Sequence, residues 1–189
     1  MTTIAVDQKL GIMAVDTLCV IGNDRKRLAS KSALFLSADP QSRLSEYIPC
    51  AIACTGHLRS LELFIQWMNG PKDSKDILWL DENDTIAMLT AGQVQSKGKT
   101  YLGIPKLLIW EGFGYNITVV PIAVASRFHS LGSGATFALS AMSFNQNVEQ
   151  AIIHASRYDP YTNEKIESYL IRRTGSKIIR GDLGAAPWI

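Results

Sequence analysis

The chain begins Met1-Thr2-Thr3-Ile4-Ala5-Val6, and Gly11-Ile12-Met13-Ala14-Val15-Asp16-Thr17 follows almost at once. Both stretches are rich in residues that favour strands, and the polar link 7–10 between them predicts a β-hairpin. A small residue behind an initiator Met normally allows that Met to be trimmed. Thr2 would then carry a free α-amine beside its own hydroxyl, which places a base and a nucleophile on one residue. Taken alone, a Thr at position 2 is commonplace, so the rest of the chain has to support this interpretation.

Length and composition set the broad class. The chain has 189 residues, 47% of them hydrophobic, and a formal net charge of +2. These values predict a single domain over 1–189 with a sizeable core, and residues 181–189 are a candidate C-terminal tail. The basic residues are scattered, so we expect no nucleic-acid partner. The sequence has no run of about 18 apolar residues and no secretory signal, so we expect no membrane span.

Three cysteines occur, Cys19, Cys50 and Cys54. An odd count without paired spacing is typical of a reducing compartment, and we expect free thiols in a cytoplasmic protein. The Cys50-x-x-x-Cys54 pair lacks a second pair of ligands, and the three histidines are dispersed. Buried free thiols are therefore expected in preference to a zinc site, and we predict no metal.

The order of elements argues for an α+β fold. Short β-rich runs occupy 3–6, 11–15, 19–22, 33–36, 51–54, 107–110, 116–124 and 166–171. Apolar residues at helical spacing predict helices over 58–68, 135–142 and 148–157. Turns are expected at 23–24 and 111–114, whereas 72–106 shows no strong period. Helices lie between runs of strands and do not alternate with each one, which favours layered packing of antiparallel sheets.

Together these pieces resemble the proteasome β-subunit family and its bacterial HslV-type relatives, the N-terminal-nucleophile threonine peptidases. The resemblance is strongest at 2–17 and 132–162, weaker over 31–68 and poor between 70 and 106. It implies a four-layer α/β/β/α sandwich of two antiparallel sheets. The chain looks like a reduced member, similar to proteasome-like proteins of bacteria and their phages.

The resemblance implies a catalytic group around the first strand. Thr2 matches the nucleophile, provided that Met1 is removed, and Asp16 matches the aspartate that holds a lysine near it. Lys31 lies about where the family places that lysine, whose charge lowers the pKa of the threonine hydroxyl. Lys26 and Arg27 are competitors for the same role if the local register slips.

Four further residues match the family's pattern. Gly56 follows a buried strand and precedes a helix, as does the glycine whose backbone N–H serves as the oxyanion donor. Ser133, within Gly132-Ser133-Gly134, matches the serine beside the terminal amine. Asp159 and Thr162, within Asp159-Pro160-Tyr161-Thr162, match the Asp-x-x-Ser/Thr element of the same network. Each motif alone usually means a turn, and their value lies in the shared order.

The resemblance implies a threonine-type endopeptidase that cleaves polypeptides without a metal or cofactor. It also implies a homo-oligomeric ring or spiral, with an AAA+ unfoldase as a candidate partner. Two alternatives stay open. One is an N-terminal-nucleophile amidohydrolase that acts on a small amide, and the other is a non-catalytic structural subunit of a ring.

Overall fold

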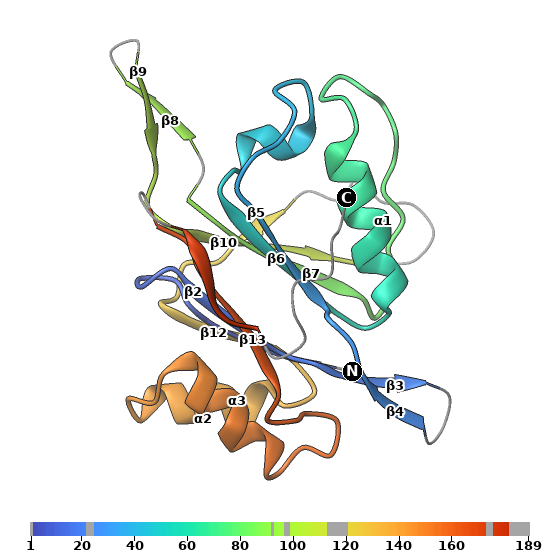
Figure 1. Cartoon of the computed structure of the whole chain (residues 1–189), viewed down its shortest axis with the longest axis vertical. Helices are drawn as coiled ribbons and strands as arrows, with labels where there is room; N and C mark the ends of the chain where they lie inside the picture. The colour runs from blue at the N-terminus through green and yellow to red at the C-terminus, as the bar shows by residue number, and fades with distance from the viewer. Residues whose placement is uncertain are drawn as a thin grey trace.

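The computed structural model of the chain describes residues 2–21, 25–91, 93–96, 99–112, 121–172 and 176–181. Two five-stranded antiparallel sheets form its centre (Figure 1). The first has the order β12-β1-β2-β13-β14. Its strands are β12 (Phe128–Gly132), β1 (Thr3–Asp7), β2 (Ile12–Asp16), β13 (Ile166–Leu170) and β14 (Lys177–Gly181). The expected hairpin is β1 paired with β2, with Ile4 opposite Val15.

The second sheet has the order β11-β10-β7-β6-β5. Its strands are β11 (Ile122–Ala123), β10 (Lys106–Glu111), β7 (Thr85–Thr90), β6 (Cys50–Thr55) and β5 (Ser32–Phe35). Two separate ribbons complete the described strands: β3 (Leu18–Ile21) with β4 (Arg25–Leu28), and β8 (Gln93–Ser96) with β9 (Lys99–Leu102).

Helices cover the outer faces of both sheets. Helix α1 (Leu58–Asn69) lies over the second sheet, and α2 (Ala135–Ser143) and α3 (Val148–Ser156) lie over the first (Figure 1). A single 3-10 turn, η1 (Arg43–Glu46), packs near α1. The chain is therefore a four-layer α/β/β/α sandwich, as the family resemblance implies.

The alternation of side chains along β1 explains the layers. Ile4 and Val6 point between the sheets, where they join a buried cluster that includes Ala51 and Leu89. Ala5 points the other way, into a cluster beneath α2 and α3. Because successive strand residues face opposite sides, a strand buried on both faces must be apolar throughout. The methyl side chain of Ala5 lets the helices approach closely.

Most predicted elements are confirmed, with shifts of one or two residues at their ends. The structure adds six strands that the sequence pattern did not indicate, namely β4, β7, β8, β9, β12 and β14. Of the predicted strand 116–124, the described part contains only β11. Four predicted stretches lie wholly or partly outside the described residues: residues 116–120 of that strand, the turn at 23–24, part of the turn at 111–114, and residues 182–189 of the tail. Strand β11 is at an edge of its sheet, which suits Pro121 just before it. The single domain over 1–189 stays a prediction.

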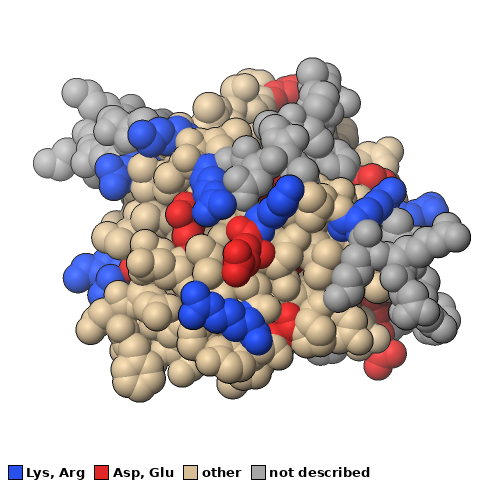
Figure 2. All heavy atoms as spheres, turned by 60° about the horizontal axis from the view of Figure 1, so that its bottom comes forward, with Lys and Arg blue, Asp and Glu red and all other residues tan. Residues whose placement is uncertain are grey.

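Two observations bear on the expectations about membranes and nucleic acids. The described helices have 12 residues or fewer, and none of them has the length and apolar character of a bilayer span. On the face shown in Figure 2, acidic and basic side chains are interspersed. The described residues on this face therefore form no broad surface of one charge, such as a nucleic acid would need.

Candidate active site

The hydroxyl of Thr2 lies against a buried cation. Lys31, in the link between β4 and β5, donates hydrogen bonds from its ammonium to Thr2 Oγ1 and to the Leu18 carbonyl. Thr2 is fully buried in the chain that carries Met1, and Lys31 is 1% exposed. A buried ammonium that contacts a hydroxyl stabilises negative charge on its oxygen much more than a solvated one does.

Asp16, the last residue of β2, holds this cation in place. One of its carboxylate oxygens accepts the Thr3 N–H at 2.6 Å, and the other accepts the Leu18 N–H at 3.0 Å. The first oxygen also lies 3.7 Å from Lys31 Nζ. Two backbone N–H donors thus fix the orientation of the carboxylate that pairs with the Lys31 ammonium.

Burial and charge act in opposite directions on this pair. Desolvation lowers the pKa of Lys31 below its ordinary value of 10.5, while the charge of Asp16 works to raise it. Desolvation likewise raises the pKa of Asp16 above 3.8, while Lys31 works to lower it. Each group therefore helps to keep the other one charged.

A buried carboxylate on β13 fixes the two neighbours of Lys31. Glu167 is 2% exposed, and its Oε2 accepts the hydroxyl of Ser30 at 2.7 Å and that of Ser32 at 2.8 Å. Alternate residues of an extended segment point to the same side, so Lys31 points to the other. Glu167 therefore anchors the segment that aims Lys31 at Thr2.

The other predicted side chains form a second network. Ser133 and Thr162 both donate their hydroxyls to Asp159 Oδ2 at 2.6 Å. Because the Thr162 proton goes to Asp159, the Thr3 hydroxyl must donate to Thr162, and Thr3 accepts the N–H of Gly134 at 3.0 Å. The donor and the acceptor of each hydrogen bond in this network are thereby assigned. Thr3 was not expected from the sequence, where it reads only as the first residue of a strand.

This network meets the nucleophile through the backbone. The Ser133 N–H donates to the Thr2 carbonyl at 3.2 Å, and Thr3 is paired with Gly132 in the sheet. Gly132 has φ +91°, and a Cβ atom there would lie 1.5 Å from the Thr2 carbonyl oxygen. Only glycine allows this approach of β12 to Thr2.

Gly56 ends β6 in a sharp turn with φ +98°. A Cβ there would lie 1.9 Å from Asp84 Oδ1, and the same oxygen accepts the N–H of the next residue, His57, at 2.9 Å. The turn is close to the second network, since a Cβ at Gly132 would lie 3.2 Å from Thr55 Cγ2. Asp84 thus holds the turn that follows β6 through the His57 N–H, and its carboxylate leaves no room for a side chain at position 56.

The structure brings the predicted residues into two neighbouring groups. Thr2, Asp16 and Lys31 form one, and Ser133, Asp159 and Thr162 form the other. Of the competitors for the lysine position, Arg27 has an exposed side chain, and the side chain of Lys26 lies outside the described residues. Within the described residues, the cation in contact with the Thr2 hydroxyl is Lys31.

Comparisons with known proteins agree with this fold. Neither a protein-family model nor a curated protein sequence matches the chain. Among solved structures, the chain is similar to Anbu from Hyphomicrobium sp. strain MC1, with a TM-score of 0.62, 14% identity and coverage of 96% of this chain and 88% of that one. The Gly-1 mutant of the same protein gives a TM-score of 0.63 with the same identity and coverage.

A third solved structure is BPH of Thiobacillus denitrificans, in complex with epoxomicin. It has a TM-score of 0.59 and 13% identity, and the match covers 92% of this chain and 100% of that one. The match extends over almost the whole chain, so the fold is that of the proteasome-like N-terminal-nucleophile hydrolases. At this level of identity the likeness concerns the fold alone.

Proposed function

We propose that the chain is a threonine-type endopeptidase of a proteasome-like assembly. The observation that carries the proposal is the buried contact between the Lys31 ammonium and the Thr2 hydroxyl. A buried ammonium costs much more than an apolar side chain of similar size even when it is paired, and buried charges with perturbed pKa values are concentrated at functional sites.

The base is the α-amine of Thr2. In the full sequence the Thr2 nitrogen belongs to the peptide bond with Met1, so it becomes a base only after Met1 is removed. A free α-amine has a pKa of about 7.7–8.0 and is partly neutral near pH 7. In this proposal the network of Ser133, Asp159 and Thr162 orients that amine; its support is the Ser133 N–H, which donates to the Thr2 carbonyl.

The reaction follows from these positions. Thr2 Oγ1 attacks the carbonyl carbon of the peptide, and the amine takes the hydroxyl proton and passes it to the leaving nitrogen. The Gly56 N–H donates a hydrogen bond to the negative oxygen of the tetrahedral intermediate. Water then hydrolyses the ester and restores Thr2, so the cycle consumes only peptide and water.

The test uses a peptide epoxyketone such as epoxomicin. The chain is produced behind a cleavable N-terminal tag, so that cleavage leaves Thr2 first. We expect an adduct at Thr2 by intact mass and peptide mapping, and no adduct on the uncleaved chain, whose Thr2 nitrogen is blocked. The Thr2→Ala and Lys31→Ala variants should also stay unmodified, whereas Lys72→Ala, which removes an exposed lysine, should react normally. A cleaved wild-type chain without an adduct would remove the proposal.

Assembly belongs to the same proposal. We infer a homo-oligomeric ring or spiral, because large apolar side chains just after α2 and α3 are open to solvent. Phe144 is 80% exposed and Tyr158 is 59% exposed. An AAA+ unfoldase is proposed as the partner that would feed the ring or spiral. A cytoplasmic location is proposed with it, since all three cysteines are free thiols.

Two other outcomes would redirect the proposal. A monomer or dimer in sedimentation that hydrolyses small amides but no peptides would identify an amidohydrolase. A mature chain that retains Met1 in a ring would identify a structural subunit. Electron microscopy of the purified chain, together with its intact mass, separates the three.

A further inference from the structure

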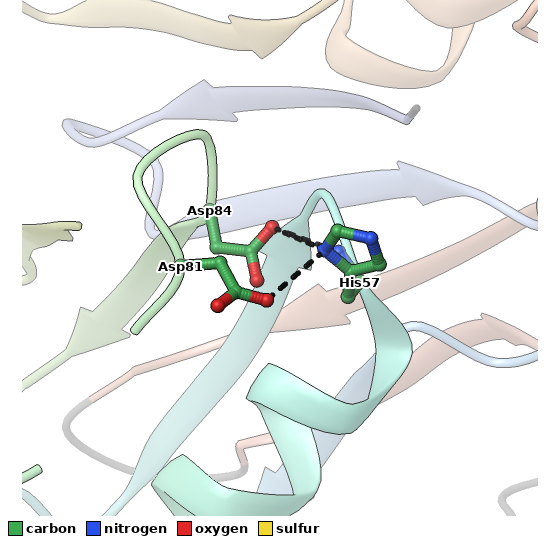
Figure 3. Close-up of side chains that lie close together, drawn as sticks. All are labelled: His57, Asp81 and Asp84. Atoms are coloured by element: carbon green, nitrogen blue, oxygen red, sulfur yellow. Dashed lines mark hydrogen bonds and ion pairs between the residues drawn. The ribbon is translucent and has the colours of Figure 1, made fainter. Parts of the chain in front are cut away.

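Three side chains with metal-binding atoms converge beside the turn that ends β6. His57 follows Gly56, and Asp81 and Asp84 come from the link before β7 (Figure 3). His57 Nδ1 lies 3.2 Å from Asp84 Oδ1 and 3.5 Å from Asp81 Oδ2. The three ligand atoms all lie within 4.8 Å of one another.

We propose that His57, Asp81 and Asp84 bind a divalent transition-metal ion of the Zn²⁺ type. Ligand atoms about 2.0–2.1 Å from a tetrahedral Zn²⁺ lie about 3.3–3.4 Å apart. The distances from His57 Nδ1 to Asp84 Oδ1 and to Asp81 Oδ2, 3.2 Å and 3.5 Å, lie close to this ligand–ligand distance. His57 Nδ1 is therefore spaced from each carboxylate as two ligands of one Zn²⁺ would be. The sequence predicted no metal because it offers His57 no ligand nearby; the fold supplies both aspartates.

Asp84 is preorganised as a ligand. Its side chain is fully buried; one oxygen accepts the His57 N–H and the other accepts the Ser60 hydroxyl. Partners of this kind, which orient a ligating carboxylate from behind, are a regular feature of metal sites. The Gly112 N–H also holds the Asp84 carbonyl at 3.0 Å.

Asp81 is set by a tight turn. The Asp84 N–H donates to the Asp81 carbonyl at 2.9 Å, which closes the turn between the two aspartates. Side-chain exposure is 75% for Asp81 and 71% for His57, so an ion can enter from solvent. Within the described residues, the Asp81 carboxylate has His57 as its ion-pair partner. Hydrogen bonds at the start of α1 account for the Asp84 carboxylate, whereas the Asp81 carboxylate contacts only His57 Nδ1 among the hydrogen bonds and ion pairs given for the described residues.

The local charge favours a cation. The N-terminus of α1 carries about half a positive charge and opposes an ion there, whereas two carboxylates supply about two negative charges. The balance is therefore negative. An imidazole among the ligands selects Zn²⁺ and related ions over Mg²⁺ or Ca²⁺, which prefer sites made of oxygen alone. Three protein ligands also leave a coordination position for water.

The test is a Co²⁺ titration of the untagged full chain, followed by visible absorption, with Zn²⁺ competition. We expect one Co²⁺ per chain, bands typical of a tetrahedral site, and displacement by Zn²⁺. His57→Ala and Asp81→Asn should each weaken Co²⁺ binding by about tenfold or more. Both side chains are largely exposed, so circular dichroism should show folded variants.

Matched controls place the ion. His154→Ala removes another histidine and Asp73→Asn another exposed aspartate; neither should change the affinity. Wild-type chain that takes up no Co²⁺, or variants that all bind it equally, would overturn the proposal. Binding is measured without any activity, so its failure is distinct from failure of the proposed peptidase. If both hold, the ion would stiffen the turn that carries Gly56, a consequence that rests on the proposed function.

Discussion

The carboxylate of Asp16 lies 3.7 Å from the ammonium of Lys31, and neither side chain is more than 2% exposed. The charge of Asp16 raises the pKa of Lys31 against the effect of burial. If the peptidase needs Lys31 charged, its activity should rise with pH as the Thr2 amine loses its proton. At higher pH the activity should fall again as Lys31 loses its proton, and this alkaline limb should come before pH 10.5 because burial lowers the pKa of Lys31. Asp16→Asn should move the alkaline limb of kcat/KM to lower pH and narrow this range. An unmoved alkaline limb would contradict the role given to Lys31.

The same variant has a stability signature. Removal of one partner of a buried ion pair costs about 3–5 kcal/mol. In Asp16→Asn the pKa of Lys31 is lower in the folded chain than in the unfolded one, so the unfolded chain binds more protons between the two values. The unfolding free energy should therefore increase with pH up to about 10.5. Urea unfolding at several pH values measures this slope, with Asp73→Asn as the control.

Glu167 is expected to support the catalytic lysine from a distance. Glu167→Ala removes the charged acceptor of the half-buried Ser30 and buried Ser32 hydroxyls, and leaves them the Ser32 carbonyl and the Tyr169 hydroxyl as partners. Because a hydrogen bond to a charged group contributes about 1.5–3 kcal/mol, the variant should be destabilised by an amount of that order. The segment that carries Lys31 should then loosen, and kcat should fall more than KM changes. Glu46→Ala, which breaks an exposed ion pair with Lys72, should cost less than about 1 kcal/mol and leave kcat unchanged. Equal effects of the two variants would disprove the positioning role.

The three cysteine thiols should differ in reactivity according to how deeply each is buried. Cys50 and Cys54 are at most 1% exposed, and burial raises the pKa of both thiols, so neither forms a reactive thiolate at neutral pH. Cys19 is half-buried. An aromatic disulfide reagent should therefore titrate Cys19 alone in the native chain and all three thiols after unfolding. Rapid native reaction of Cys54 would place the end of β6 at the surface.

Periodic and strongly apolar elements could be predicted from the sequence. The β1–β2 hairpin, α1 and β13 have patterns that burial imposes directly. Strands β4 and β12 could not be predicted, because they are polar or half-buried and take strand form from pairing with β3 and β1. The same holds for the parts of the site that depend on distant contacts. Nothing near Glu167 in sequence indicates Ser30 or Ser32.

The order of the motifs along the chain predicted more of the site residues than local sequence patterns did. The resemblance selected Lys31 although Lys26 and Arg27 lie close by, and the structure brings Lys31 to Thr2. It could not select Thr3, because a threonine in a strand has no signal that separates a hydrogen-bonded role from β propensity. Nor could it pair His57 with Asp84, which lies 27 residues away.

Gly132 should be the least replaceable glycine of the site. A Cβ there would lie 1.5 Å from the Thr2 carbonyl oxygen, and φ +91° disfavours any other residue. Gly132→Ala should therefore push β12 away from β1, lower the Tm and displace Thr2 from Lys31, so that no epoxyketone adduct forms. Gly70→Ala is the matched control, since φ there is −71° and the nearest atom to a new Cβ is the movable Arg43 Nη1 at 2.8 Å. A Gly132→Ala chain that reacts with the epoxyketone like wild type would show that the approach of β12 to Thr2 does not position the nucleophile.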